Sequence, residues 1–97
     1  MNSFKKLNSQ EYDIIGHWLK SDGRVVADNN CNRIDYLVNH ALIRLASDLS
    51  GWLTLFQDPT DGRYWELSYP ESSDHGGGPP RLRILTHEEA KNKFIIE

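Results

Sequence analysis

The clearest alternation of apolar and polar positions lies in the middle of the chain and predicts a long helix over residues 31–47. Apolar side chains recur there at intervals of three and four, which places them on one face of an α-helix. The polar run Asp28-Asn29-Asn30 suits a helix N-cap, and Ser50-Gly51 is typical of a helix end. The apolar positions are Ile34, Leu37, Val38, Ala41, Leu42 and Leu45.

A turn signal before that helix predicts a first hairpin. Asp22-Gly23 separates two short apolar stretches, a combination typical of two-residue hairpin turns. We expect strands near residues 17–20 and 24–27. Further upstream, Asn8 followed by Glu11 at the third position matches a capping box and predicts a short helix near the N-terminus.

A second hairpin is predicted by the turn sequence Asp58-Pro59-Thr60-Asp61-Gly62. Aspartate suits the first position of a type I turn, proline the second, and glycine the left-handed conformation that closes the loop. The flanking segments 52–56 and 63–69 are rich in strand-favouring residues, so we expect them to be strands. Alternation along the second strand places Trp65 on one face of the sheet and Glu66 on the other.

Large aromatic side chains gather on this second hairpin. Packing in the core is the favoured interpretation for most of them. The alternative is that one aromatic face stays exposed beside the acidic residues, as in a protein-binding hot spot. The aromatic residues concerned are Trp52, Tyr64, Trp65 and Tyr69.

Two final elements follow a loop rich in proline and glycine. Residues 81–85 alternate as a strand, and Thr86 with Glu89 forms a capping box that opens a short helix to about Phe94. The whole pattern predicts an α+β fold. It consists of an antiparallel sheet of about five strands, with one long helix packed on a face and short terminal helices.

Length and composition limit the class of protein. The 97 residues suit a single domain over residues 1–97, and 38% apolar with 26% charged residues does not match a disordered chain. No apolar run approaches about 18 residues, so we expect no membrane span. The N-terminus leads into no apolar region, so we expect no signal peptide. Cys31 is the only cysteine and cannot form an internal disulfide. We expect a soluble, cytoplasmic protein, and its oligomeric state is left open.

The charge of the chain is unevenly placed. A net charge of −3 argues against non-specific binding to nucleic acid. Between residues 58 and 74 five acidic side chains face a single base, and acidic patches attract basic partners. We expect the hairpin tip and the following loop to form one acidic partner-binding surface. Its residues are Asp58, Asp61, Arg63, Glu71, Asp74, His75, Gly76, Gly77 and Gly78.

The run from His75 through three glycines to Pro79-Pro80 is the most unusual segment. Glycine loses much backbone entropy on folding, so a special loop conformation or a close approach is needed there. A row of backbone N–H groups would also make an oxyanion hole. However, the chain has no Gly-x-Ser-x-Gly motif and no Gly-Lys-Ser/Thr after the glycines. We favour loop geometry and keep His75 beside Asp74 as a candidate binding pair.

Histidine and cysteine give weaker signals. Cys31 lies at the start of the predicted helix, where a helix dipole would lower the pKa of a nucleophilic thiol. A small buried hydrophobe is the more ordinary interpretation of a lone cysteine. The histidines show no spacing typical of zinc ligands, so we expect no metal site. They are His17, His40, His75 and His87.

The second hairpin and the loop after it carry a family resemblance. The segments Asp58–Pro70 and His75–Pro80 together resemble the immunity protein 27 family of bacterial polymorphic toxin systems. Shorter matches elsewhere fit the same pattern. They are Gly16-x-Trp18, Arg33-Ile34, Gly51-Trp52 and Glu88-Glu89-Ala90.

The resemblance implies an α+β immunity protein made in the cytoplasm beside its toxin. Such a protein neutralises the toxin by binding it, with no enzymatic activity and no cofactor. From the residues, we expect the cognate toxin to present a basic surface. Reversal of Asp58, Asp61 and Asp74 to lysine should then weaken toxin binding. Two alternatives stay open: a small enzyme or small-ligand binder that uses the His75 loop, and an adaptor that binds peptides at its sheet edge.

Overall fold

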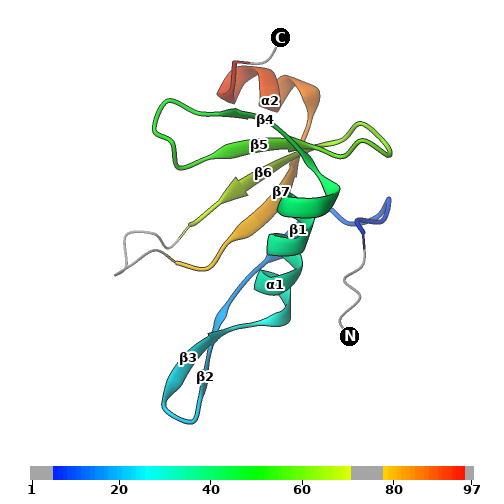
Figure 1. Ribbon diagram of the computed structural model, residues 1–97. Coiled ribbons are helices and arrows are strands. Elements are labelled where there is room, and N and C mark those ends of the chain that lie inside the picture. Colours follow the sequence, from blue (N-terminus) through cyan, green and yellow to red (C-terminus); the bar gives the residue numbers. More distant parts are fainter. Residues whose placement is uncertain (1–5, 71–77, 96–97) are drawn as a thin grey trace.

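A computed structural model describes residues 6–70 and 78–95 of the protein (Figure 1). A five-stranded antiparallel sheet has the order β1-β7-β6-β5-β4, and β2 with β3 forms a separate two-stranded sheet. The α+β class and the sheet of five strands are therefore confirmed. The elements are β1 (Asp13–Ile15), β2 (Trp18–Ser21), β3 (Arg24–Ala27), α1 (Asn29–Tyr36), η1 (Leu37–Ala41), β4 (Ile43–Ser47), β5 (Thr54–Gln57), β6 (Tyr64–Ser68), β7 (Arg81–Leu85) and α2 (His87–Lys93).

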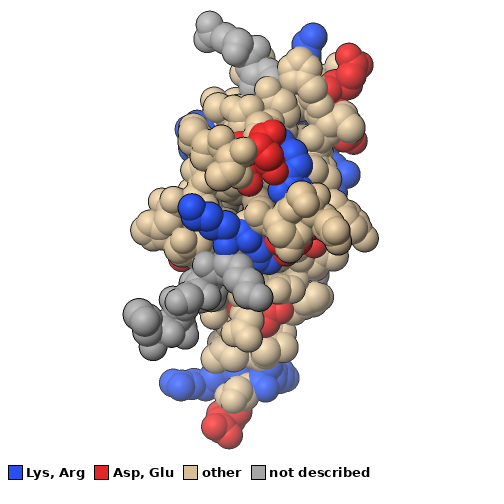
Figure 2. Space-filling view, turned by 90° about the vertical axis from the view of Figure 1, so that its right-hand side faces the viewer, with Lys and Arg blue, Asp and Glu red and all other residues tan. Residues whose placement is uncertain are grey.

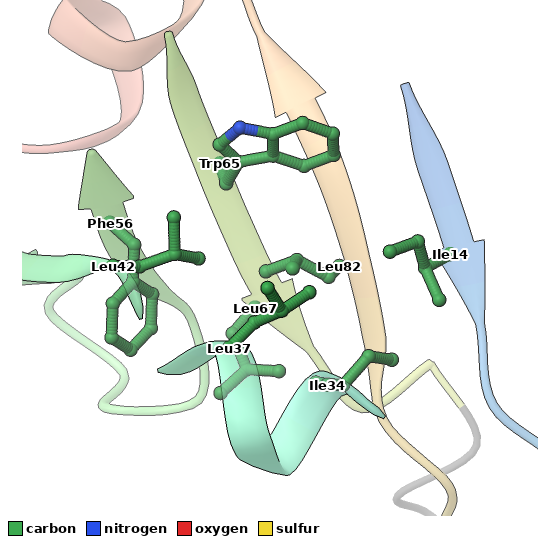
Figure 3. Close-up of a cluster of buried hydrophobic side chains, with 8 residues drawn as sticks. All are labelled: Ile14, Ile34, Leu37, Leu42, Phe56, Trp65, Leu67 and Leu82. Carbon is green, nitrogen blue, oxygen red and sulfur yellow. The ribbon is translucent and has the colours of Figure 1, made fainter. Parts of the chain in front are cut away.

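The larger hydrophobic core lies between the sheet and the α1–η1 segment (Figure 3). Trp65 of β6 and Leu82 of β7 are fully buried there against Ile34 of α1 and Leu37 of η1. Alternation along the strands explains why these side chains share one face. The complete cluster is Ile14, Ile34, Leu37, Leu42, Phe56, Trp65, Leu67 and Leu82.

A smaller core covers the opposite face of the sheet. Leu55 and Leu85 pack there against Ala90 and Phe94 from the C-terminal helix region. The Thr86 hydroxyl accepts a hydrogen bond from the Glu89 N–H, and the Glu89 carboxylate accepts one from the Thr86 N–H. The predicted capping box and last helix are thus confirmed, and both faces of the sheet are partly covered.

The predicted long helix over 31–47 is wrong in its second half. α1 and the π-helical turn η1 end at Ala41, and Leu42 is already extended, with φ −109° and ψ 154°. Residues 43–47 pair with β5 as the edge strand β4. Leu45 fits the helical spacing, but its segment forms backbone hydrogen bonds with β5, the next strand along the chain. Tertiary context has therefore overridden the local pattern.

The predicted N-terminal helix is also wrong, although its capping signal is real. The Asn8 N–H donates to the Glu11 carboxylate, and the Glu11 N–H donates back to the Asn8 side chain, each at 3.0 Å. These bonds close a turn, and the chain then continues as β1, which pairs with β7. The strand-favouring residues after Glu11 explain why no helix follows.

The first predicted hairpin is confirmed, but it lies outside the main sheet. Asp22 and Gly23 have φ values of 53° and 75°, as a two-residue type I′ turn requires. The hairpin of β2 and β3, which we call the arm, extends away from the body of the protein (Figure 1). Its large apolar side chains are exposed: Trp18, Leu19, Val25 and Val26. β1 and β4 take the two places in the main sheet that we expected for the arm.

No helix within residues 6–70 and 78–95 is both long enough and apolar enough to cross a membrane.

Candidate partner-binding site

The tip of the second hairpin is a tightly bonded turn between β5 and β6. The Asp58 N–H donates to the Arg63 carbonyl at 2.9 Å, and the Gly62 N–H donates to the Asp58 carbonyl at 2.8 Å. Gly62 has a φ of 80°, the left-handed conformation expected of it. Asp58 Oδ1 accepts hydrogen bonds from the Thr60 N–H and hydroxyl at 2.9 and 2.7 Å. Asp58 is therefore a turn-forming residue, and only 5% of its surface is exposed.

Arg63 fastens this tip to the N-terminal turn. Its Nη1 donates to the Glu11 carbonyl at 2.8 Å, and its Nη2 donates to the Asn8 carbonyl at 2.9 Å. Its guanidinium also lies 5.1 Å from the centre of the Trp65 ring, a cation–π geometry. The three contacts connect the turn to both the N-terminal segment and the core, so the tip is held rigidly.

Asp61 is the second acidic residue of the tip, and it is paired with Arg63. Its carboxylate accepts hydrogen bonds from the Arg63 N–H at 3.0 Å and from Nε at 2.6 Å. Partial burial opposes ionisation, but these bonds outweigh it and lower the pKa of Asp61. Asp61 is thus an anion at neutral pH with part of its charge already compensated.

Acidic residues around the sheet are more fully paired than their sequence density indicates. Glu66 is buried on the α2 face, where Lys93 lies 2.9 Å and Arg83 3.6 Å from its carboxylate oxygens. In Figure 2 acidic and basic side chains lie next to one another over the body of the protein. Within the described part of the chain, Asp58 is the acid of the hairpin that has no ion pair.

A hollow of about 190 Å³ lies beside Asp58. Three segments that are distant in sequence form it: the N-terminal segment, the end of η1 and the β5–β6 turn. Leu7, Ala41 and Pro59 give apolar walls, and Lys6, His40, Asp58 and Thr60 give polar groups. This hollow could not be predicted from the sequence, because its walls meet only in the folded chain.

The predicted site residues do not all lie together. Asp58, Asp61 and Arg63 share the β5–β6 turn, whereas Gly78 lies buried before β7, at the opposite end of β6. Residues 58–63 precede β6, whereas Gly78 lies next to the other end of β6, just before β7 (Figure 1). The other predicted residues lie outside the described part of the chain: Glu71, Asp74, His75, Gly76 and Gly77.

Cys31 has the environment of a buried core residue. Its side chain is 6% exposed, and its Sγ lies 3.5 Å from the His17 carbonyl. Burial is the largest effect on this thiol and raises its pKa, which opposes the activation a nucleophile needs. Among the described residues no group of three or more histidine, cysteine or acidic side chains is arranged to hold a metal ion.

The aromatic residues divide between core and surface. Trp65 is fully buried, Tyr64 stacks on His87 with ring centres 5.6 Å apart, and Tyr69 is partly exposed. Trp52 is 60% exposed in the turn between β4 and β5. Core packing is therefore right for Trp65, while Trp52 is exposed, the outcome that the alternative interpretation allowed. The exposed apolar residues of the arm are surface features that sequence reasoning did not select.

The fold defines a small α+β protein in which three of the described site residues, Asp58, Asp61 and Arg63, lie on one rigid turn. A family model described as Immunity protein 27 matches residues 20–86, more than half of the chain. The chain therefore belongs to the immunity protein 27 family, and the resemblance read from its sequence is confirmed. No curated protein and no solved structure matches the chain. Family membership implies an immunity protein that neutralises a toxin, and such families are generally not enzymatic.

Proposed function

We propose that this protein is a cytoplasmic bacterial immunity protein, with one domain spanning the chain, that binds the cognate toxin of a polymorphic toxin system. Neutralisation follows from protein–protein contact, without catalysis and without a cofactor. The observation that carries this proposal is the match to the immunity protein 27 family. The partner is a toxin domain with a basic surface, and neither nucleic acid nor membrane is a partner.

The β5–β6 turn is the contact we favour on this protein. Arg63 anchors it through two carbonyls of the N-terminal turn, and the Asp58 and Asp61 side chains are held by hydrogen bonds. A rigid turn loses little conformational entropy on binding, so more of the contact energy appears as affinity. Electrostatic attraction between the acidic turn and a basic surface would also speed association.

The segment that follows β6 in the sequence is the second part of the proposed contact. Glu71, Asp74, His75, Gly76, Gly77 and Gly78 remain its proposed residues. A strand of five residues is about 17 Å long. A standard interface buries about 800 Å² on each partner, which is wide enough to include both ends of such a strand. One toxin surface can therefore reach both ends of β6.

The test is toxin binding and neutralisation by a charge-reversed variant. Asp58 is buried and a lysine there would disturb the turn, so the reversal is confined to the exposed Asp61, as Asp61→Lys with Asp74→Lys. The matched control is Asp35→Lys, an exposed acidic position on α1. In the double variant we expect calorimetry to show toxin binding that is at least tenfold weaker, a loss of about 1.4 kcal/mol. In the control we expect no loss of affinity. Equal affinity for all three proteins would contradict this interface.

A further inference from the structure

We propose that the hollow beside Asp58 is a socket for one basic side chain, a lysine or an arginine, of the toxin. The inference rests on the proposed function and names the chemistry that one part of the interface recognises. The hollow is lined by Lys6, Leu7, His40, Ala41, Asp58, Pro59 and Thr60.

The negative charge inside the socket comes from Asp58, which is more than nine-tenths buried, while Lys6 in the wall is exposed. Its Oδ1 accepts both bonds from Thr60, and no hydrogen bond to Oδ2 is formed by any residue in the described segments. In those segments, Trp65 Nε1 is the one side-chain nitrogen or oxygen that is both fully buried and without a partner. Asp58 Oδ2 has no partner either, so it is not fully buried and solvent can reach it. Asp58 borders the hollow. In the proposal, a cation that enters this space reaches Oδ2.

A buried carboxylate without an ion pair favours a cation over other ligands. No ion pair of Asp58 is found among the described residues, and that includes its neighbour Lys6 in the wall of the hollow. Hydrogen bonds between ionised groups are roughly twice as strong as those between neutral groups. An anion such as phosphate would instead meet the charge of Asp58 at short range.

The shape of the socket matches a side chain that is apolar along its stem and charged at its end. Leu7, Ala41 and Pro59 line the walls, and Asp58 supplies the negative charge. The hollow of about 190 Å³ has room for about six waters at roughly 30 Å³ each, enough for a long side chain. Lysine and arginine bury their stems on apolar surface and present a charged head group, as this arrangement requires.

The experiment is a nitrogen-15 NMR titration of the full chain with small probes of each charge. The cationic probes are Nα-acetyl-arginine methylamide and Nα-acetyl-lysine methylamide. The citrulline analogue is the neutral control, and inorganic phosphate is the anionic one. We expect saturable shifts of the Leu7, Ala41 and Thr60 amides with a cationic probe only. The cationic probe that binds with the higher affinity identifies the preferred head group. No saturation with either cation, or equal shifts with citrulline or phosphate, would overturn the inference.

Two variants tie the binding to the socket. Asp58→Asn removes the charge but keeps an oxygen that can accept the bonds from Thr60, and it should bind the cationic probe at least tenfold more weakly. Ala41→Leu narrows the hollow from the η1 side and leaves the residues of the Asp58 turn unchanged. It should have the same effect, which preserves the test if the first variant alters the turn. Unchanged probe binding in a folded variant would overturn the inference. Toxin neutralisation by the wild type without probe binding would reject the socket and leave the proposed function standing.

Discussion

The two hairpins of this protein have similar turn signals and opposite surroundings. The β5–β6 hairpin lies inside the main sheet, covered on both faces, while the β2–β3 arm forms its own sheet and exposes its apolar side chains. Turn residues act on their immediate neighbours, so they specify that a hairpin forms in each place. Burial of a hairpin depends on which other elements pack against its two faces. The β5–β6 hairpin has such elements on both faces, and the arm does not.

The two hairpins also differ in how they are attached. Arg63 binds the β5–β6 turn to the N-terminal turn and to Trp65. The arm is held at its base, where the Asp28 N–H donates to the His17 carbonyl and the Gly16 N–H donates to the Pro80 carbonyl. A turn fixed at its tip is suited to present charges in one geometry, which is why we place the toxin contact there.

The largest expected contrast is in the stability of the two hairpins. Leu55→Ala in β5 removes a side chain with no exposed surface and should cost about 2–5 kcal/mol in the free energy of unfolding. Leu19→Ala in the arm removes one that is 50% exposed and should cost less than about 1 kcal/mol. Urea unfolding measures both. Similar costs at the two positions would show that the arm packs against more of the protein than we find.

The base of the arm should tolerate no added methyl group. A Cβ at Gly16 would lie 2.6 Å from Cys31 Sγ and 2.8 Å from the Pro80 carbonyl oxygen. Overpacking of this kind costs about 1–3 kcal/mol, so Gly16→Ala should lower the midpoint of urea unfolding. Adding Cys31→Ala should restore part of the loss, because it removes the sulfur contact and leaves the carbonyl contact. A Gly16→Ala protein as stable as the wild type would contradict the close approach.

The anchor of the β5–β6 turn should depend on pH through Glu11. Hydrogen bonds from the Arg33 guanidinium lower the pKa of Glu11 below its ordinary value of 4.5. A carboxyl whose pKa is depressed by folding stabilises the protein above its unfolded pKa and loses this effect as pH falls through the folded pKa. Glu11→Gln should therefore cost up to about 1 kcal/mol at pH 7 and converge with the wild type in acid. Parallel pH profiles for the two proteins would be inconsistent with the pairing.

The smallest global effect is expected from the turn of the arm. Gly23 has a φ of 75°, and alanine there costs about 1 kcal/mol of local stability. Because the arm contributes little to either core, the midpoint of urea unfolding should change little, while the amides of Leu19 and Val26 exchange about five- to tenfold faster. Hydrogen exchange by NMR checks this. A loss of protection spread through β5 and β6 would mean that the arm and the sheet unfold as one unit.

Local signals predicted much of the fold. Both hairpin turns, strand β7 and the capping box of α2 follow from residues close together in sequence. The end of η1 and the strand β4 did not follow, because Leu42 and Leu45 continue the helical spacing while pairing with β5 decides their conformation. β1 was missed for the same reason, since its partner β7 lies far along the chain.

The candidate site was predictable only in part. The turn chemistry of Asp58, Asp61 and Gly62 was readable from their order in the sequence. The reach of Arg63 to Asn8 and Glu11 was not, because the contact joins residues separated by more than half the chain. The hollow beside Asp58 was also unpredictable, because it joins segments that are distant in sequence. The pairing of Glu66 with Lys93 was unpredictable for the same reason, and it removes one acid from the expected patch.

Hydrogen–deuterium exchange of the toxin complex compares the two hairpins most directly. The protein would be measured alone and then bound to the toxin encoded beside its gene, with peptides that cover residues 18–27 and 58–63. We predict slower exchange at 58–63 on binding, with unchanged exchange across the arm. Protection of the arm with no change at 58–63 would contradict the account and move the toxin interface to β2 and β3.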